Sequence, residues 1–360
     1  MPSLKEIKGR INSISSTLAI TSAMKMVAAA KLQKAQMAIQ NMLPYERRLH
    51  SMLIDLMGAM NISAAASEDG SVRGSGSAER GFDQSGDRLS LSNRHDLAGM
   101  DGAYSLMAQR EVRKVAIVAF ASNSSLCGAF NSNAIREATA VINEYRASGL
   151  GDADITVYSV GRKMAEAMKK LGFPSPADFT KMSDSPSYDA ASALAQELFD
   201  GFVSGRFDKV ELVYNHYKST SSQPTTRQTY LPLSLADATA DIQVGKITDS
   251  ASESDTYRGA ESVGAPVVRQ GSPTTETPDL IVEPSKEELI VTLLPKVVRL
   301  RVFTTLLDST AAEQAARTVA MQLATDNGND LLQELTLEYN KGRQQKITSE
   351  ILDIVGGSMQ

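Results

Sequence analysis

The feature that most constrains this fold is a long heptad pattern at the N-terminus. Mostly apolar side chains, with a polar or small stretch at Thr21, Lys25 and Ala28, recur from Leu4 to Met42 in alternating steps of three and four residues, which places them on one face of an α-helix. The positions are Leu4, Ile7, Ile11, Ile14, Leu18, Thr21, Lys25, Ala28, Leu32, Ala35, Ile39 and Met42. The pattern predicts one helix over residues 3–58, about 80 Å long, with Pro44 as its place to bend.

A second helical pattern lies at the other end of the chain. No proline occurs between Val297 and Val355, and the pair 356–357 is a Gly-Gly stop signal, so we predict a helix of about 90 Å. Its apolar positions are Ala312, Ala316, Val319, Leu323, Leu332, Leu335, Tyr339, Ile347, Ile351 and Ile354. Two long helical seams at opposite ends favour an antiparallel coiled coil, and each seam has a polar or small stretch, at Thr21–Ala28 and at 326–330.

Between the two helices the pattern changes to that of an α/β domain. Apolar stretches rich in Val and Leu alternate with helical stretches, an order typical of a parallel, Rossmann-like sheet. The predicted strands are 112–121, 155–160 and 209–216, and the predicted helices are 131–148, 161–171 and 187–204. The fold class is therefore α/β, with a coiled coil added to a central parallel-sheet domain.

Polar segments divide the chain into five parts. Residues 62–110 and 238–279 are rich in Ser and Gly and cannot readily bury a core. We interpret them as flexible insertions, with a private binding element as the alternative. The predicted parts are the helix 1–60, an insertion 61–110, the α/β domain 111–236, an insertion 237–280 and the helix 281–360.

Charge and composition narrow the classes of function. Residues 1–48 carry eight Lys or Arg against two Glu, whereas the whole chain has a net charge of -5. Such a basic helix suits nucleic acid, a membrane surface or an acidic protein cavity. Trp is absent and aromatic residues make up only 5%, so nucleic-acid binding ranks last. A single cysteine excludes an intramolecular disulfide, and the first residues lack the apolar run of a signal peptide, which favours a soluble or peripherally bound protein.

The loop after the first predicted strand is where an α/β domain would carry a catalytic or phosphate-binding motif. This loop, 122–131, contains one glycine instead of the three of a dinucleotide fingerprint. Cys127 could act as a nucleophile if His216 lay near it, but a small buried residue at a turn is the more common role of such a cysteine. The histidines His50, His95 and His216 share no metal-ligand spacing. We predict no catalytic, cofactor or metal site, and keep a Cys127 enzyme and a coiled-coil adaptor as alternatives.

Several motifs resemble one known family. Residues 20–36 read ITSAMKMVAAAKLQKAQ, and the C-terminal part contains EQAAR at 313–317 and YNKGRQ at 339–344. The middle adds LCGAFN at 126–131 and VYNHYKS at 213–219. These segments are similar to those of the gamma subunits of F-type ATP synthases, and the likeness covers nearly everything except the two polar insertions.

The resemblance implies a function and a set of partners. It implies a non-catalytic rotary shaft that couples proton flow to ATP turnover, with its coiled coil inside a ring of three alpha and three beta subunits. The α/β domain would rest on the epsilon subunit and the c-subunit ring, on the cytoplasmic side of a bacterial inner membrane. By the same resemblance Met24 and Lys25 face beta subunits, Arg343 and Gln344 engage a beta loop, and Glu283 lies near the c ring. No cofactor and no nucleic acid are implied.

Overall fold

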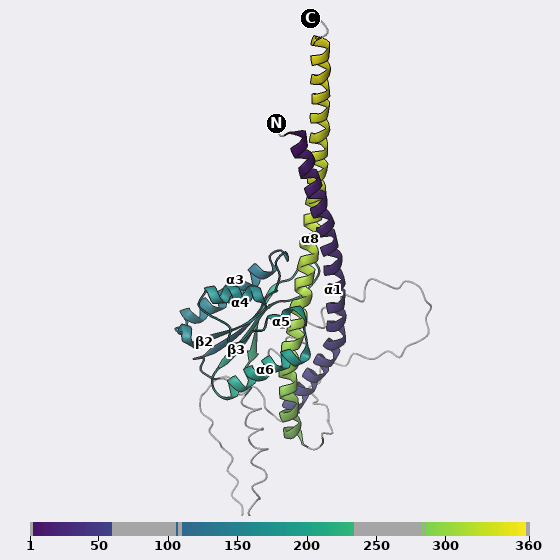
Figure 1. The fold of residues 1–360 in the computed structure, drawn as a ribbon. Helices are drawn as coiled ribbons and strands as arrows, with labels where there is room; N and C mark the ends of the chain where they lie inside the picture. Colours follow the sequence, from purple (N-terminus) through teal and green to yellow (C-terminus); the bar gives the residue numbers. More distant parts are fainter. Residues whose placement is uncertain (1–2, 60–105, 107–109, 234–282, 284, 358–360) are drawn as a thin grey trace, which may run out of the picture.

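The computed structural model of the chain describes residues 3–59, 106, 110–233, 283 and 285–357. Apart from Leu106 and Arg110, the predicted insertion 61–110 lies outside the described residues, as does the whole of the insertion 237–280. The described part consists of two long helices, which form a shaft, and an α/β domain attached to its lower half (Figure 1).

The shaft is the antiparallel helix pair predicted from the heptad patterns. Helix α1 spans Leu4–Ala59 and helix α8 spans Lys286–Gly357. Their register is fixed by close contacts: a Cβ atom added at Gly328 would lie 2.6 Å from Leu18 Cδ2, and Thr325 Oγ1 donates to Thr21 Oγ1 over 3.2 Å. All twelve positions of the N-terminal seam are buried or half-buried, which confirms that seam.

Both shaft helices begin at a serine cap and continue through a proline. The hydroxyl oxygens of Ser3 and Ser285 each accept the backbone N–H three residues later, which satisfies one of the free donors of a helix start. Helix α8 therefore begins at Lys286, within the predicted helical part 281–360 and before the proline-free stretch that starts at Val297. The buried residues that surround Pro295 offset the hydrogen bond that the proline removes.

The C-terminal seam is shorter than predicted. Gly342 lies against Leu4, the first residue of α1, so the rest of α8 stands alone (Figure 1). Four positions assigned to that seam are exposed by 47–71%: Leu323, Ile347, Ile351 and Ile354. The last three are exposed because α1, which begins at Leu4, does not extend alongside them. Leu323 lies on the outer face of the pair.

The α/β domain is built on a four-stranded sheet in the order β2-β1-β3-β4. The strands β1 (Val115–Phe120), β2 (Ile155–Val160) and β3 (Lys209–Asn215) are parallel, as predicted. The fourth strand, β4 (Thr225–Leu231), is antiparallel to β3 and was missed by the sequence analysis. Its first five residues are half-buried and mostly polar, so no apolar alternation marks it. The sheet is therefore mixed.

Helices cover both faces of the sheet. The predicted helices are confirmed as α3 (Phe130–Ala147), α4 (Arg162–Lys170) and α6 (Tyr188–Val203), and the structure adds the short helices η2 (Asp152–Asp154) and α5 (Thr180–Asp184). One face of the sheet packs on α3 and α4, and the other on α6 and the lower half of the shaft. Strand β1 is buried on both faces, which explains its continuous apolar sequence.

The domain and the shaft share one core. Leucines 49, 53 and 56 of α1 and the first five turns of α8 pack in the same apolar cluster as α6 and the sheet. Polar contacts add direction: Tyr230 Oη donates to the Val298 carbonyl over 2.9 Å, and Arg299 Nη2 donates to Gln196 Oε1 over 2.6 Å. The α/β domain is thus fixed to the shaft.

This shared core generates a stability prediction. Tyr230→Phe removes the hydroxyl that reaches the Val298 carbonyl in a fully buried position, so we expect the free energy of unfolding to fall by about 1 kcal/mol. Urea unfolding followed by circular dichroism measures the change. Tyr188→Phe is the matched control, since that ring packs edge-on against Phe303 and is 42% exposed. Equal stability of Tyr230→Phe and wild type would contradict the assigned bond.

Candidate functional site

The edge of the sheet at which α/β domains bind ligands is occupied by α8. Ligands usually sit where neighbouring strands diverge at their carboxyl ends, which here is between β1 and β3. Arg317 Nη2 of α8 donates to Ser124 Oγ over 2.7 Å, next to the end of β1. After β3, the Asp308 carboxylate of α8 accepts from His216 Nδ1 over 2.6 Å and from the Tyr217 backbone N–H over 2.9 Å. This edge therefore holds a helix of the same chain.

Cys127 belongs to this contact with α8. Its side chain is buried, its sulfur accepts a hydrogen bond from Asn131 Nδ2 over 3.2 Å, and it packs with Phe130 and Ala312. His216, the proposed base, is instead paired with an acidic side chain of α8. The geometry of these residues gives the hypothesis of a Cys127 nucleophile no support.

The His216–Asp308 pair has a definite pH behaviour. The hydrogen bond to Asp308 raises the pKa of His216 above its ordinary value, although burial and the nearby Lys218 lower it. A raised pKa means that the charged imidazolium stabilises the folded chain. That contribution is fully present below the ordinary pKa of histidine and is lost as the pH rises through the raised value.

A second polar contact on α8 is buried. Glu313 and Arg317 are each less than 10% exposed, and Arg317 Nη2 lies 2.8 Å from Glu313 Oε1. Burial raises the pKa of Glu313 even though Arg317 acts to lower it; Asp184 of α5 raises it further and Lys31 of α1 lowers it. The charges of α1 and α5 thus act on a carboxylate of α8 that is buried beside the loop that follows β1.

A third charged cluster lies inside the domain, and its chemistry is structural. Glu211 of β3 is 1% exposed and is reached by Arg227 Nε at 2.6 Å, Lys209 Nζ at 2.7 Å and Tyr145 Oη at 2.6 Å. Arg227 also pairs with Glu144 at the surface. Burial acts to raise the pKa of Glu211, but the hydrogen bonds from its three partners outweigh burial and lower it. These three partners keep the Glu211 carboxylate ionised and fix its position, so the cluster has a structural role.

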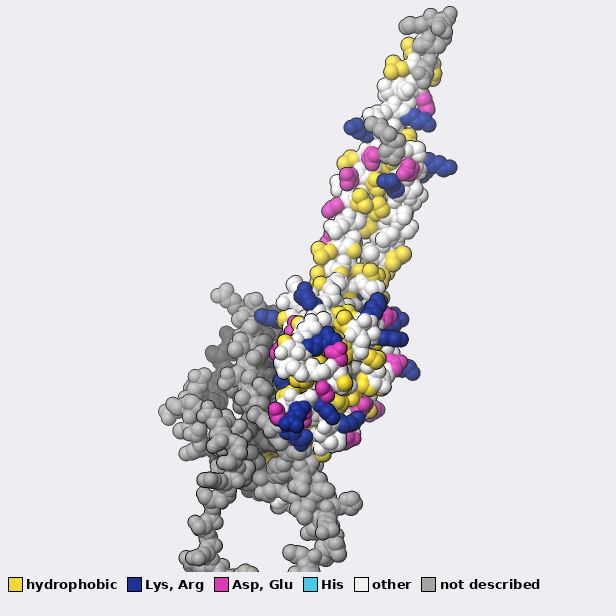
Figure 2. Space-filling view, turned by 90° about the vertical axis from the view of Figure 1, so that its left-hand side faces the viewer, with side chains coloured by type: hydrophobic (Ala, Val, Ile, Leu, Met, Phe, Trp, Pro, Cys, Tyr) yellow, Lys and Arg dark blue, Asp and Glu magenta, His cyan; other side chains and the backbone are white. Residues whose placement is uncertain are grey.

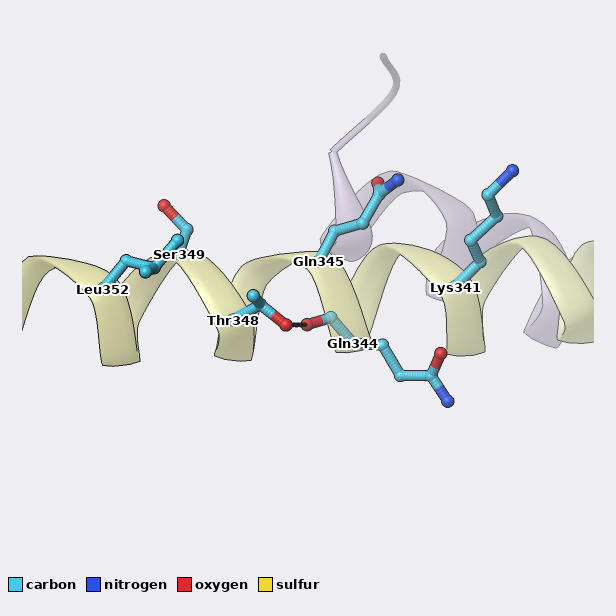
Figure 3. Close-up of a pocket in the computed structure, with 6 residues that line it drawn as sticks. All are labelled: Lys341, Gln344, Gln345, Thr348, Ser349 and Leu352. Atoms are coloured by element: carbon cyan, nitrogen blue, oxygen red, sulfur yellow. Dashed lines mark hydrogen bonds between the residues drawn. The ribbon is translucent and has the colours of Figure 1, made fainter.

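The described residues offer little else for small-molecule chemistry. They contain no group of three His, Cys, Asp or Glu side chains that could hold a metal ion. A shallow, open depression of about 440 Å³ lies on α8 near its free end, between Lys341 and Leu352 (Figure 3). Its side chains project from a single helix, so nothing encloses a ligand. No helix within the described ranges has the length and apolar character required to cross a bilayer.

The predicted contact residues lie at three heights along the chain. Met24 and Lys25 are half-buried on α1, next to Thr21 in the helix pair, while Arg343 and Gln344 are exposed where α8 emerges from the pair. Gln344 projects from the side of α8 opposite to Lys341 and Gln345 in Figure 3. Glu283 is exposed at a bend just before α8, and its neighbours at 279–282 and 284 lie outside the described residues. The structure thus distributes these residues over the length of the shaft and does not gather them into one site.

Sequence reasoning missed one surface, the free end of α8. The large apolar side chains there are exposed by 46–71%: Ile347, Ile351, Leu352, Ile354 and Val355. Further down, the shaft shows charged side chains of both signs between apolar patches (Figure 2). A comparison of the two helix lengths with the antiparallel register would have revealed this end as unpaired.

A long helix pair with an unpaired apolar end and a domain whose ligand edge is filled defines a shaft-like subunit of a larger assembly. The comparisons with known proteins agree. The family model described as ATP synthase matches residues 3–359. The ATP synthase gamma chain of Phocaeicola vulgatus is 47% identical over 359 residues and that of Bacteroides thetaiotaomicron 44% over 360 residues, with 100% of both chains covered in each case.

The chain therefore belongs to the ATP synthase family, among its gamma chains. A solved structure of the Euglena gracilis mitochondrial ATP synthase has the same fold, with a TM-score of 0.52 and 19% identity over 99% of this chain and 93% of that one. As a gamma chain it is a non-catalytic subunit, so the alternatives of a Cys127 enzyme and a free-standing adaptor are set aside.

The buried Glu211 cluster gives a prediction about stability and pH. Glu211→Gln removes the charge that three donors share, so we expect the free energy of unfolding at pH 7 to fall by about 2 kcal/mol. Because the pKa of Glu211 is lowered, its contribution is present above the ordinary value of 4.5 and is lost as the pH falls below it. Thermal unfolding between pH 3 and pH 7 should show the two proteins converging in acid.

The control for this prediction is an exposed ion pair. Glu166→Gln breaks a 3.5 Å pair with Lys163 in which the Glu166 side chain is 52% exposed, and it should change stability by less than about 0.5 kcal/mol. A constant difference between Glu211→Gln and wild type from pH 3 to pH 7 would refute the role assigned to the charge.

Proposed function

We propose that this chain is the central rotary shaft of an F-type ATP synthase, which couples proton flow through a c ring to ATP synthesis or hydrolysis at beta subunits. The observation that carries the proposal is the unpaired end of α8. Five large apolar side chains on a free-standing helix favour burial in a partner, since soluble proteins rarely leave a contiguous apolar surface in water. A sleeve formed by three alpha and three beta subunits would provide that burial.

The middle of the shaft suits rotation inside such a sleeve. At the level of Thr21 and Thr325 the two helices meet through a hydrogen bond between small polar side chains. Residues 11–24 of α1 carry no charged side chain, and charged side chains of both signs stand elsewhere along the shaft (Figure 2). Solvated polar contacts are individually weak and exchangeable, whereas a continuous apolar seal would favour one angle. This distribution supports a shaft that turns.

The contact residues are part of the proposal. Met24 and Lys25 would face the beta subunits, and Arg343 and Gln344 would engage a beta loop. Within the described residues neither Lys25 nor Arg343 has an ion-pair partner, so both cations are available to acidic groups of another subunit. Glu283, exposed beneath α8, would lie near the c ring, and the epsilon subunit would contact the α/β domain. The chain would then act at the cytoplasmic face of a bacterial inner membrane, as a peripheral component.

Assembly tests the proposed function directly. Co-expression of the tagged chain with alpha and beta subunits of the same enzyme should yield a complex of three alpha, three beta and one copy of this chain that hydrolyses ATP. The isolated chain should neither bind nor hydrolyse ATP. Native mass spectrometry gives the stoichiometry.

A chain truncated after Gly342 should lose affinity for the complex, since it lacks the apolar end, and undiminished affinity would contradict the role given to that end.

Arg343 gives a residue-level prediction. Arg343→Ala should lower proton pumping per ATP about threefold, the value of one solvated charged contact, and leave the unfolding free energy within about 0.5 kcal/mol of wild type. Proton uptake and ATP hydrolysis measured in the same vesicles give the ratio. Lys346→Ala is the matched control, because that exposed lysine lies on the same helix and pairs only loosely with Glu350 at 3.7 Å. Unchanged pumping per ATP in Arg343→Ala would remove Arg343 from the set.

A further inference from the structure

Two residues that follow β3 contact both shaft helices. The Asp308 carboxylate of α8 accepts from His216 Nδ1 with one oxygen and from the Tyr217 backbone N–H with the other. On the other side, Gln36 Nε2 of α1 donates to Tyr217 Oη over 2.6 Å. We call these four residues, Gln36, His216, Tyr217 and Asp308, the strand-end joint. It ties the sheet to both helices through one dipeptide.

The joint is set in an apolar contact between the same three elements. The Tyr217 ring packs on Leu32 and Ala35 of α1 and on Ala311 and Ala315 of α8. It also touches the buried group made by Cys127, Phe130 and Ala312. Alanines of both helices therefore line the contact with the half-buried Tyr217 ring.

Geometry distinguishes this joint from the other domain–shaft contacts. Apolar packing is non-directional, so it resists separation more than it resists rotation of one surface over another. Hydrogen bonds weaken steeply when their angle is distorted. The Asp308 carboxylate holds two donors from consecutive residues at once, so a turn of α8 about its own axis strains both. The bonds at Tyr230 and Arg299 each hold α8 at one point and do not involve α1.

We propose that the strand-end joint transmits torque between the α/β domain and the shaft. Its four residues are then positioning residues for coupling, and none of them is among the contact residues that the resemblance names. This inference rests on the proposed function, in which the domain turns with a c ring and the shaft works inside the alpha and beta subunits. Torque has to cross from the domain to both helices, and the joint contacts both.

The test compares, in the whole enzyme, ATP hydrolysis without an opposing proton gradient and ATP synthesis driven by one. Complexes that carry Asp308→Ala, Asp308→Asn or Tyr217→Phe are reconstituted in vesicles. ATP hydrolysis in vesicles made proton-leaky by an ionophore reports unloaded turning, and ATP synthesis driven by an imposed proton gradient reports turning under load. We expect Asp308→Ala to retain unloaded hydrolysis and to lose synthesis by about fivefold, the equivalent of one ordinary hydrogen bond. Asp308→Asn, which keeps an acceptor oxygen, should recover part of that loss.

Thr304→Val is the matched control. Thr304 Oγ1 donates to Glu46 Oε1 over 3.1 Å, so the variant loses a half-buried bond between α1 and α8 and none between the domain and the shaft. It should synthesise ATP at the wild-type rate. Tyr217→Phe removes only a hydroxyl and keeps the packed ring, so it provides a reading even if Asp308→Ala assembles poorly.

The outcomes separate the joint from the proposed function. If Asp308→Ala and Tyr217→Phe both synthesise ATP as fast as the wild type and the Thr304→Val control, the joint does not transmit torque. A parallel loss of loaded and unloaded activity in the joint variants, with a lower melting temperature, would also overturn the inference, since it indicates a merely structural role. Failure of the wild-type chain itself to assemble or couple would instead refute the proposed function.

Discussion

The pairing of α1 with α8 is the contact on which the rest of the structure depends. Its partners are Leu4 with Gly342 at one end and the shared core around Leu49 and Leu294 at the other, so the two ends of the sequence have to meet before either helix can bury its face. Isolated helices gain little stability from propensity alone, and tertiary packing supplies the rest. Small residues in the seam make the approach close: without a side chain at Gly328, Leu18 fills the space between the backbones. The lower half of this pair in turn helps to cover one face of the sheet of the α/β domain.

The unequal lengths of the two helices separate three kinds of surface along one shaft. The lower part of the pair is packed against the domain. The middle carries polar, charged and exposed apolar side chains, among them Ile20 and Met26, and the end of α8 is a single helix with apolar residues in solvent. A symmetric pair would have buried Ile347 and Ile351 against α1 and left no apolar end for a partner. The register therefore decides which part of α8 is left without α1 beside it.

The sequence predicts the features that repeat and misses those that depend on a single contact. Heptad steps revealed α1, and the continuous apolar stretch revealed β1, because periodicity follows directly from burial. Ser3 and Ser285, each with a Glu three residues later, cap the two helices, and this local signal was not used in predicting where they start. Strand β4 is an edge strand with half-buried polar residues, which carry no alternation. The contacts of His216 and Asp308 join residues 92 positions apart, and no local pattern encodes them.

An α/β sheet in a protein without a catalytic site of its own has a physical explanation. The carboxyl edge of parallel strands offers diverging loops and free backbone groups, which in enzymes hold a substrate or a cofactor. Here the loops after β1 and β3 hold α8 through Arg317 and Asp308. A site of this kind binds with defined orientation, and orientation is what a domain requires if it is to turn a helix instead of slipping around it. The geometry that elsewhere positions a ligand thus positions a shaft, which is why the polar groups at this edge are paired with side chains of α8.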